Sequence, residues 1–207
     1  IRLSESKDEI DWVKYGFSDS DVLNAFCGYK KFEPYIEGVS PVVYLKGLDV
    51  LNKQTIATYG NYLSDNDLEI LKENKVSFCY CPRVSKKLHN QVLDFKKVNE
   101  TFGKRYGFGT NSLAFNDDMS LLNEVRFVNN GILDAKEVIS HLTKYPAKIL
   151  RLDNIIGTLE MGKDADFNIF WLNEGEDYNA ILNKTRPDYV YIKGRKMVSR
   201  GNLVSGI

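Results

Sequence analysis

The three cysteines and two histidines of this sequence are the side chains best suited to nucleophilic or metal chemistry. Cys79 and Cys81 are separated by one residue within a run of β-forming residues. In an extended strand they would face the same side, where they could ligate a metal together or be buried. Because no second cysteine pair accompanies them, the spacing favours burial.

Two further positions could bind a ligand. His89 follows a Cys-Pro turn and could face a pocket, and Arg83 in that turn could bind an anionic group or lie exposed. His141 stands in a predicted amphipathic helix near the surface, where we expect a structural or solvated role. Gly107 and Gly109 do not make a phosphate loop, because no Gly-x-x-x-x-Gly-Lys pattern follows them.

The composition is that of an ordinary globular protein, with 43% hydrophobic and 27% charged residues among 207. Lys+Arg and Asp+Glu are each 28, so no overall field would attract nucleic acid or an acidic membrane. An odd number of cysteines fits a reducing cytosol, and we expect a cytoplasmic protein. No apolar run approaches the ~20 residues that would span a bilayer.

Hydrophobic periodicity predicts short strands that alternate with helices. The predicted strands are 54–58, 76–80 and 105–110, and the predicted helices are 8–14, 19–25, 68–74, 93–101, 119–128, 135–143 and 146–150. A long loop is expected after residue 80. Strands separated by helices pair in parallel through right-handed crossovers. Segments 165–172, 189–192 and 196–204 alternate around glycine turns, which predicts a terminal antiparallel β piece.

The expected strands are too few for a closed barrel. The chain begins as if at the end of a strand, and it supplies only about four strands where a (β/α)8 barrel needs eight. Half a barrel would leave an open parallel edge and an uncovered apolar face. Either another polypeptide segment completes it, or the fold is of another kind.

Five motifs carry a family resemblance, and they follow the family's order along nearly the whole chain. They are Cys81–Leu88, Gly109–Asn116, Met119–Arg126, Thr143–Leu150 and Ile156–Phe167. Together they resemble the C-terminal half of the amidohydrolase superfamily. The branch they resemble is that of the chlorohydrolases and nucleoside deaminases, which includes the aminofutalosine deaminases.

The resemblance implies an α/β fold. Residues 1–152 would be the second half of a (β/α)8 TIM-type barrel, and residues 153–207 would supply the C-terminal strands of a small β-sandwich. An N-terminal half of the same fold, on the same or a separate chain, would be the partner. The resemblance further implies a small-molecule ligand, and a homo-oligomer stays open. The balanced charge predicts no nucleic-acid or membrane partner.

The family binds zinc or iron through a His-x-His pair, a later histidine and an aspartate. The start of this chain resembles the family's His-x-x-Glu motif, which puts Glu5 at the proton-shuttle position and Arg2 at a ligand position. Tyr59 stands where the second catalytic histidine would be, and Asn111 replaces the metal-binding aspartate. A guanidinium has no lone pair and an amide oxygen is a weak ligand, so we expect no metal cofactor.

Two functions follow from the resemblance and these substitutions. The first is a hydrolase segment that acts on C–N bonds of an aminopurine-like substrate. Its catalytic residue would be Glu5, and its substrate-binding residues would be Arg2, Tyr59, Arg83, His89 and Asn111. The second is a pseudoenzyme that serves as a binding or assembly module, with Arg2 in the metal's space and paired with Glu5. Without the resemblance, Glu5 could simply interact favourably with the dipole of a helix, and Tyr59 could simply pack at the end of a strand.

Overall fold

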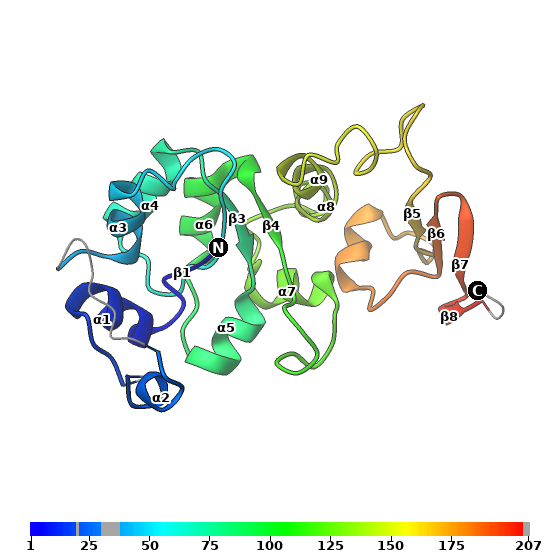
Figure 1. The fold of residues 1–207 in the computed structure, drawn as a ribbon. Coiled ribbons are helices and arrows are strands. Elements are labelled where there is room, and N and C mark those ends of the chain that lie inside the picture. The colour runs from blue at the N-terminus through cyan, green and yellow to red at the C-terminus, as the bar shows by residue number, and fades with distance from the viewer. Residues whose placement is uncertain (20, 30–37, 205–207) are drawn as a thin grey trace. The chain divides into compact units, whose positions relative to one another are not determined.

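The computed structural model describes residues 1–19, 21–29 and 38–204. The chain divides into two compact units, Ile1–Arg105 and Tyr106–Ile207, and each is described by itself (Figure 1). The predicted boundary between residues 152 and 153 follows family motifs, and it stays a prediction. None of the described helices is long and apolar enough to cross a membrane.

The first unit is built on three parallel strands in the order β1-β2-β3. They are β1 (Arg2–Leu3), β2 (Ile56–Tyr59) and β3 (Ser77–Tyr80). Leu3 lies opposite Tyr59, and Thr58 lies opposite Cys79. Because the strands are parallel and in this register, the residues that follow them meet at one edge of the sheet.

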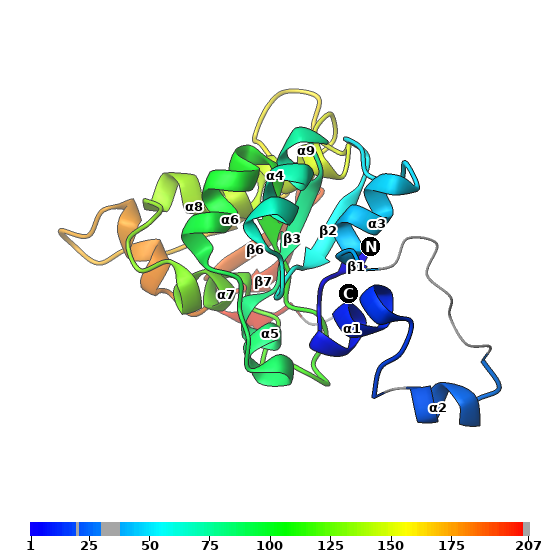
Figure 2. The ribbon, with the colours of Figure 1, turned by 90° about the vertical axis from the view of Figure 1, so that its left-hand side faces the viewer.

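The described helices of this unit are α1 (Lys7–Tyr15), α2 (Asp21–Phe26), α3 (Pro41–Gly47), α4 (Asp65–Glu73), α5 (Pro82–His89) and α6 (Phe95–Phe102), with a 3-10 turn at Gly103–Arg105. Helices α3, α4 and α6 pack side by side (Figures 1 and 2). Helix α4 begins with a capping box, in which Ser64 and Asp67 satisfy each other's backbone N–H groups.

Two helices begin at a proline, and neither was predicted. The expected long loop after residue 80 is wrong, because α5 starts at Pro82, and His89 is its last residue rather than a loop residue. Helix α3 likewise starts at Pro41, after the N-cap Ser40. Proline needs no donor in the first helical turn and its φ is already helical, so in these two places it marks a helix start.

An aromatic layer holds α6 against the sheet. Phe78 of β3 stacks on Phe102 of α6 at 4.6 Å between ring centroids, and Tyr80 stacks on Phe95 at 5.8 Å. The Tyr80 hydroxyl donates to the Leu93 carbonyl at 2.6 Å, which satisfies the one polar atom of this buried ring. These rings make the core of the first unit.

The second unit combines helices with an antiparallel sheet. It contains β4 (Tyr106–Phe108), α7 (Leu121–Val128), α8 (Ala135–Leu142), α9 (Lys144–Ile149), β5 (Phe167–Ile169), a 3-10 helix (Tyr178–Asn183), β6 (Tyr189–Ile192), β7 (Arg195–Ser199) and β8 (Asn202–Leu203). The order β5-β6-β7-β8 confirms the predicted antiparallel piece. Arg126 of α7 donates to the carbonyls of Leu182 and Lys184, which ties this helix to the segment before β6.

His141 is buried, so its predicted position near the surface is wrong. Helix α8 packs on β4, and the His141 ring stacks on Tyr106 at 3.9 Å between centroids. Nδ1 donates to the Tyr106 carbonyl at 3.0 Å. Burial lowers the pKa of His141 from its ordinary value of 6.5, although the hydrogen bond to Tyr106 and the charge of Glu137 oppose this shift.

We expect this histidine to make the protein less stable in acid. With its pKa lowered in the folded state, the unfolded chain binds the proton more readily, so stability is complete above pH 6.5 and falls as the pH drops toward the folded pKa. Urea unfolding at several pH values between about 7.5 and 5.5 measures how steeply the free energy of unfolding changes with pH. These limits lie about one pH unit either side of the ordinary histidine pKa. His141→Gln should flatten this slope; an unchanged slope in folded His141→Gln would contradict the prediction.

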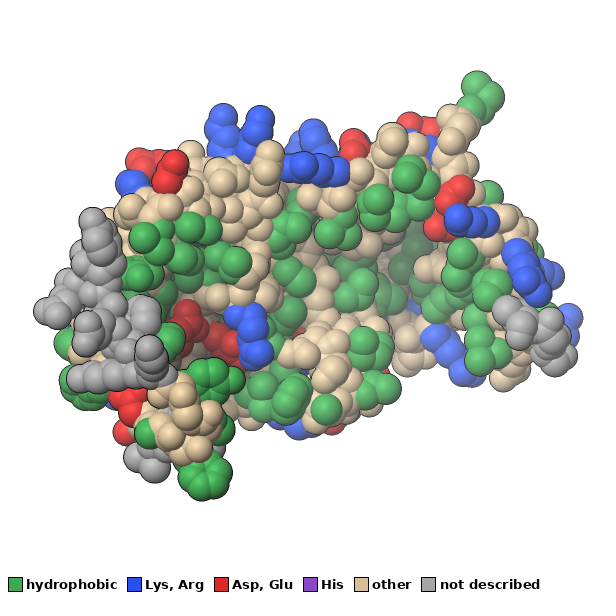
Figure 3. Space-filling view, in the orientation of Figure 1, with side chains coloured by type: hydrophobic (Ala, Val, Ile, Leu, Met, Phe, Trp, Pro, Cys, Tyr) green, Lys and Arg blue, Asp and Glu red, His purple; other side chains and the backbone are tan. Residues whose placement is uncertain are grey.

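Charged side chains are distributed over the surface. On the face in Figure 3, lysines and arginines occur in several separate groups, with acidic side chains among them. This pattern agrees with the equal numbers of basic and acidic residues in the sequence.

Candidate functional site

The carboxylate of Glu5 lies at the edge of the sheet where β1 ends, and it is held by Arg2. Arg2 Nε donates to Oε2 at 2.6 Å and Nη2 donates to Oε1 at 2.5 Å, a bidentate pair. The hydrogen bond to Glu5 raises the pKa of the Arg2 guanidinium. The Glu5 side chain is 12% exposed and that of Arg2 is 64% exposed. The predicted pairing of the two residues is therefore present, with the arginine on the solvent side.

His89 reaches the same carboxylate from α5. Its Nε2 lies 3.2 Å from Glu5 Oε1, and its side chain is 19% exposed. Since an ionised carboxylate only accepts hydrogen bonds, Nε2 carries the hydrogen in this contact. Two donors from different elements therefore converge on Glu5.

The backbone around Glu5 is clamped by two residues that sequence reasoning missed. Glu9, in the first turn of α1, accepts from the backbone N–H groups of Ser4 and Glu5, each at 2.8 Å. Asn61, which follows β2, donates to the Glu5 carbonyl at 2.9 Å. The Ser-x-x-Glu spacing of Ser6 and Glu9 is a capping-box pattern and could have indicated this arrangement.

We expect Glu9→Ala to loosen this segment. The two amides would lose a charged acceptor, and the free energy of unfolding would fall by about 1–3 kcal/mol. Hydrogen exchange should become faster at Ser4 and Glu5, and urea unfolding measures the loss of stability. Glu69→Ala, on the exposed surface of α4, is the matched control and should leave both unchanged. Full amide protection in Glu9→Ala would contradict the prediction.

Tyr59 is the last residue of β2, and it contacts both Arg2 and a group of buried side chains. It is 3% exposed and has φ 74°, an unusual conformation for a bulky residue. The Arg2 guanidinium lies 5.0 Å from its ring centroid, within range of a cation–π interaction. Tyr59 also packs with Cys81, Val84 and Cys79. We call Arg2, Glu5, Tyr59 and His89 the Glu5 cluster.

The other two predicted site residues are Arg83 and Asn111. Arg83 is half-buried in the first turn of α5. Asn111 belongs to the second unit, where it is exposed and has φ 59°, a left-handed conformation that asparagine tolerates. Asn116 steadies this loop by donating to the Thr110 carbonyl at 3.1 Å and to Glu124 at 2.6 Å. The ligand-binding roles of Arg83 and Asn111 stay predictions.

Few side chains that could ligate a metal lie together within residues 1–19, 21–29 and 38–204. No group of three or more His, Cys, Asp and Glu side chains there has an arrangement that could hold a metal ion. At the Glu5 cluster the carboxylate contacts an arginine and one histidine.

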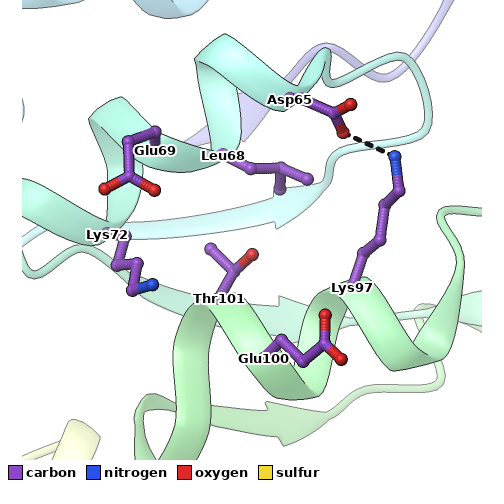
Figure 4. Close-up of a pocket in the computed structure, with 7 residues that line it drawn as sticks. All are labelled: Asp65, Leu68, Glu69, Lys72, Lys97, Glu100 and Thr101. Atoms are coloured by element: carbon purple, nitrogen blue, oxygen red, sulfur yellow. Dashed lines mark hydrogen bonds and ion pairs between the residues drawn. The ribbon is translucent and has the colours of Figure 1, made fainter.

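A separate groove runs between α4 and α6 (Figure 4). It has a volume of about 250 Å³ and is lined by Asp65, Leu68, Glu69, Lys72, Lys97, Glu100 and Thr101. Lys97 Nζ donates to Asp65 at 2.5 Å across the groove. Both signs of charge alternate along its walls and none of the predicted site residues lines it, so we do not assign it a ligand.

Comparisons with known proteins place this geometry in context. The model of the amidohydrolase family matches residues 30–197. The chain is 32% identical over 146 residues to the 5-methylthioadenosine/S-adenosylhomocysteine deaminase of Caldanaerobacter subterraneus subsp. tengcongensis, which covers 66% of this chain and 34% of that protein. It is 26% identical over 212 residues to the aminodeoxyfutalosine deaminase of Nitratiruptor, covering 96% of this chain and 49% of that protein.

A solved structure shows the same fold. An adenosine deaminase from Xanthomonas campestris with bound zinc superposes with a TM-score of 0.74 at 20% identity, and the match covers 100% of this chain and 46% of that one. This chain therefore has the mixed α/β, TIM-barrel-like fold of the amidohydrolases. It spans about half or less of the length of these relatives.

Proposed function

This chain belongs to the amidohydrolase family, and we propose that it contributes the Glu5 cluster to a pocket for an adenosine-like ligand. The observation that carries the proposal is the convergence of Arg2 and His89 on the Glu5 carboxylate at the carboxyl edge of parallel strands. Barrel enzymes place their active sites at this edge. A relative's name supplies the ligand class, since it describes a deaminase of 5-methylthioadenosine and S-adenosylhomocysteine.

We propose further that binding at this cluster does not use zinc or iron. The family's metal would need a lone-pair donor at the position of Arg2, and a guanidinium has none. Both Glu5 oxygens already accept from Arg2, and Oε1 also contacts His89, so the carboxylate is already engaged by an arginine and a histidine. The residues of this chain therefore do not fit the metal.

A second candidate is a hydrolase segment that acts on the C–N bond of an aminopurine-like substrate. The names of the relatives favour it. In that case Glu5 would move a proton between water and the leaving amine, and it would first have to exchange its contacts with Arg2. Purine-nucleoside binding without turnover, as in a pseudoenzyme, needs no such exchange.

The proposal includes the surrounding architecture. Residues 1–152 would be the second half of a (β/α)8 barrel, and residues 153–207 would be the C-terminal strands of a small β-sandwich. An N-terminal half of the same fold, on this or another chain, would complete the pocket, and a homo-oligomer is compatible with it. A cytoplasmic location is part of the proposal, because the three free cysteines fit a reducing compartment.

Metal content and ammonia release separate the two candidates. We expect the purified protein to contain no stoichiometric zinc or iron by elemental analysis. Calorimetry should detect binding of 5-methylthioadenosine, and a coupled assay should detect no ammonia. Zinc or iron near one atom per chain, together with ammonia release that a chelator abolishes, would overturn the metal-free proposal and establish the hydrolase.

A further inference from the structure

Cys79 and Cys81 form a pair of thiols beside the Glu5 cluster that the proposed function does not use. Cys79 lies in β3, and Cys81 is the N-cap residue of α5. Their Sγ atoms are 3.9 Å apart, which confirms that residues two apart face the same side here. Neither cysteine takes part in a disulfide.

The separation of the sulfurs matches a shared metal ion better than a disulfide. A disulfide needs an S–S distance of about 2.05 Å, so the two sulfurs would have to approach by nearly half of their present separation. Two thiolates that each bind one metal at about 2.3 Å are about 3.8 Å apart at a tetrahedral angle and about 4.6 Å apart in a linear arrangement. The pair therefore has to adjust by no more than about 0.7 Å to share a metal, whereas a disulfide requires it to close by about 2 Å.

The surroundings keep the pair in place and leave it reachable. The Thr58 hydroxyl donates to the Cys79 carbonyl at 2.9 Å and its oxygen lies 3.7 Å from Cys81 Sγ, so β2 fixes both residues. Cys81 is 5% exposed, whereas Cys79 is partly exposed. Tyr59, the last residue of β2, packs with both cysteines and adds to this support.

The number of ligands selects the kind of ion. Structural zinc takes four ligands, and the part of the chain that the structure describes offers no group of three or more His, Cys, Asp and Glu side chains to hold one. Soft ions with low coordination numbers are satisfied by thiolate sulfur alone, and Cu(I) is the first-row example.

We propose that Cys79 and Cys81 are a dithiolate site for a soft cation of low coordination number, represented by Cu(I). On binding, each thiol loses its proton to solvent and two Cu–S bonds form, with no change in the oxidation state of copper or sulfur. The inference does not depend on the proposed nucleoside pocket.

Anaerobic titration of the fully reduced protein with Cu(I), in competition with a chromophoric Cu(I) chelator, tests the site. We expect the wild-type protein to withdraw one Cu(I) per chain from the chelator. Since loss of even an outer-shell partner weakens metal sites by roughly 10- to 100-fold, Cys79→Ser should lose at least that much affinity. Cys27→Ser removes the exposed third cysteine and should bind as the wild type does.

A loss of Cu(I) binding can be distinguished from a loss of folding. Cys79 is partly exposed, so its serine variant should fold, and circular dichroism checks this; Cys81→Ser is the second test of the pair. Wild-type Cu(I) affinity in a folded Cys79→Ser protein, a loss of affinity in Cys27→Ser, or no uptake by the wild type would overturn the proposal. Failure to bind 5-methylthioadenosine would leave it unaffected.

Discussion

Phe102→Ala is expected to lower the free energy of unfolding by about 3–5 kcal/mol. Phe102 is 1% exposed, and its ring lies nearly parallel to that of Phe78, with an interplanar angle of 5°. Removing it deletes the buried area of one ring and leaves a cavity between α6 and β3. The Arg105 guanidinium, 6.0 Å from the same ring, would lose its aromatic partner as well. Urea unfolding followed by circular dichroism measures the change.

The control for Phe102→Ala is the same substitution at an exposed phenylalanine of the same unit. Phe26, at the end of α2, is 87% exposed, so Phe26→Ala should change the unfolding free energy by less than about 0.5 kcal/mol. Equal destabilisation by the two substitutions would show that ring burial between α6 and β3 is not what stabilises this unit. A loss near zero in Phe102→Ala would show the same.

The strands of the first unit could be predicted because their residues carry the information locally. The apolar β-forming run that ends at Tyr80 marks β3, and the Ser64 capping cluster marks the start of α4. The two missed helices begin at Pro41 and Pro82, where no helix was predicted. Proline has both meanings, and only the packing of the residues after it, such as the fully buried Val84, decides between them.

The candidate site could be predicted only in part. The ion pair of Arg2 and Glu5 could be anticipated because the family resemblance puts both residues at the site and only two residues separate them in the chain. The contact of His89 with Glu5 joins residues 84 positions apart, and no local pattern encodes it. For His141, the amphipathic pattern of α8 identified the helix but not which face β4 would cover. Long-range packing decided both outcomes.

Glu5→Ala is expected to weaken binding of 5-methylthioadenosine by about 2–5 kcal/mol, or roughly 30-fold or more in Kd. The 12% exposed carboxylate is the shared acceptor of Arg2 and His89, so its removal leaves two donors unpaired at the proposed pocket. Glu5→Gln should weaken binding less, because its amide oxygen can still accept one hydrogen bond from Arg2.

Isothermal calorimetry on folded variants measures this effect, with Glu69→Ala as the matched control. Glu69 is an exposed carboxylate on α4 of the same unit, and it takes no part in the Glu5 cluster. A general effect of lost negative charge would weaken both alanine variants alike, whereas a role for the cluster weakens Glu5→Ala alone. If folded Glu5→Ala binds as tightly as the wild type, the carboxylate does not organise the ligand pocket, and Arg2 and His89 must be assigned a purely structural pairing.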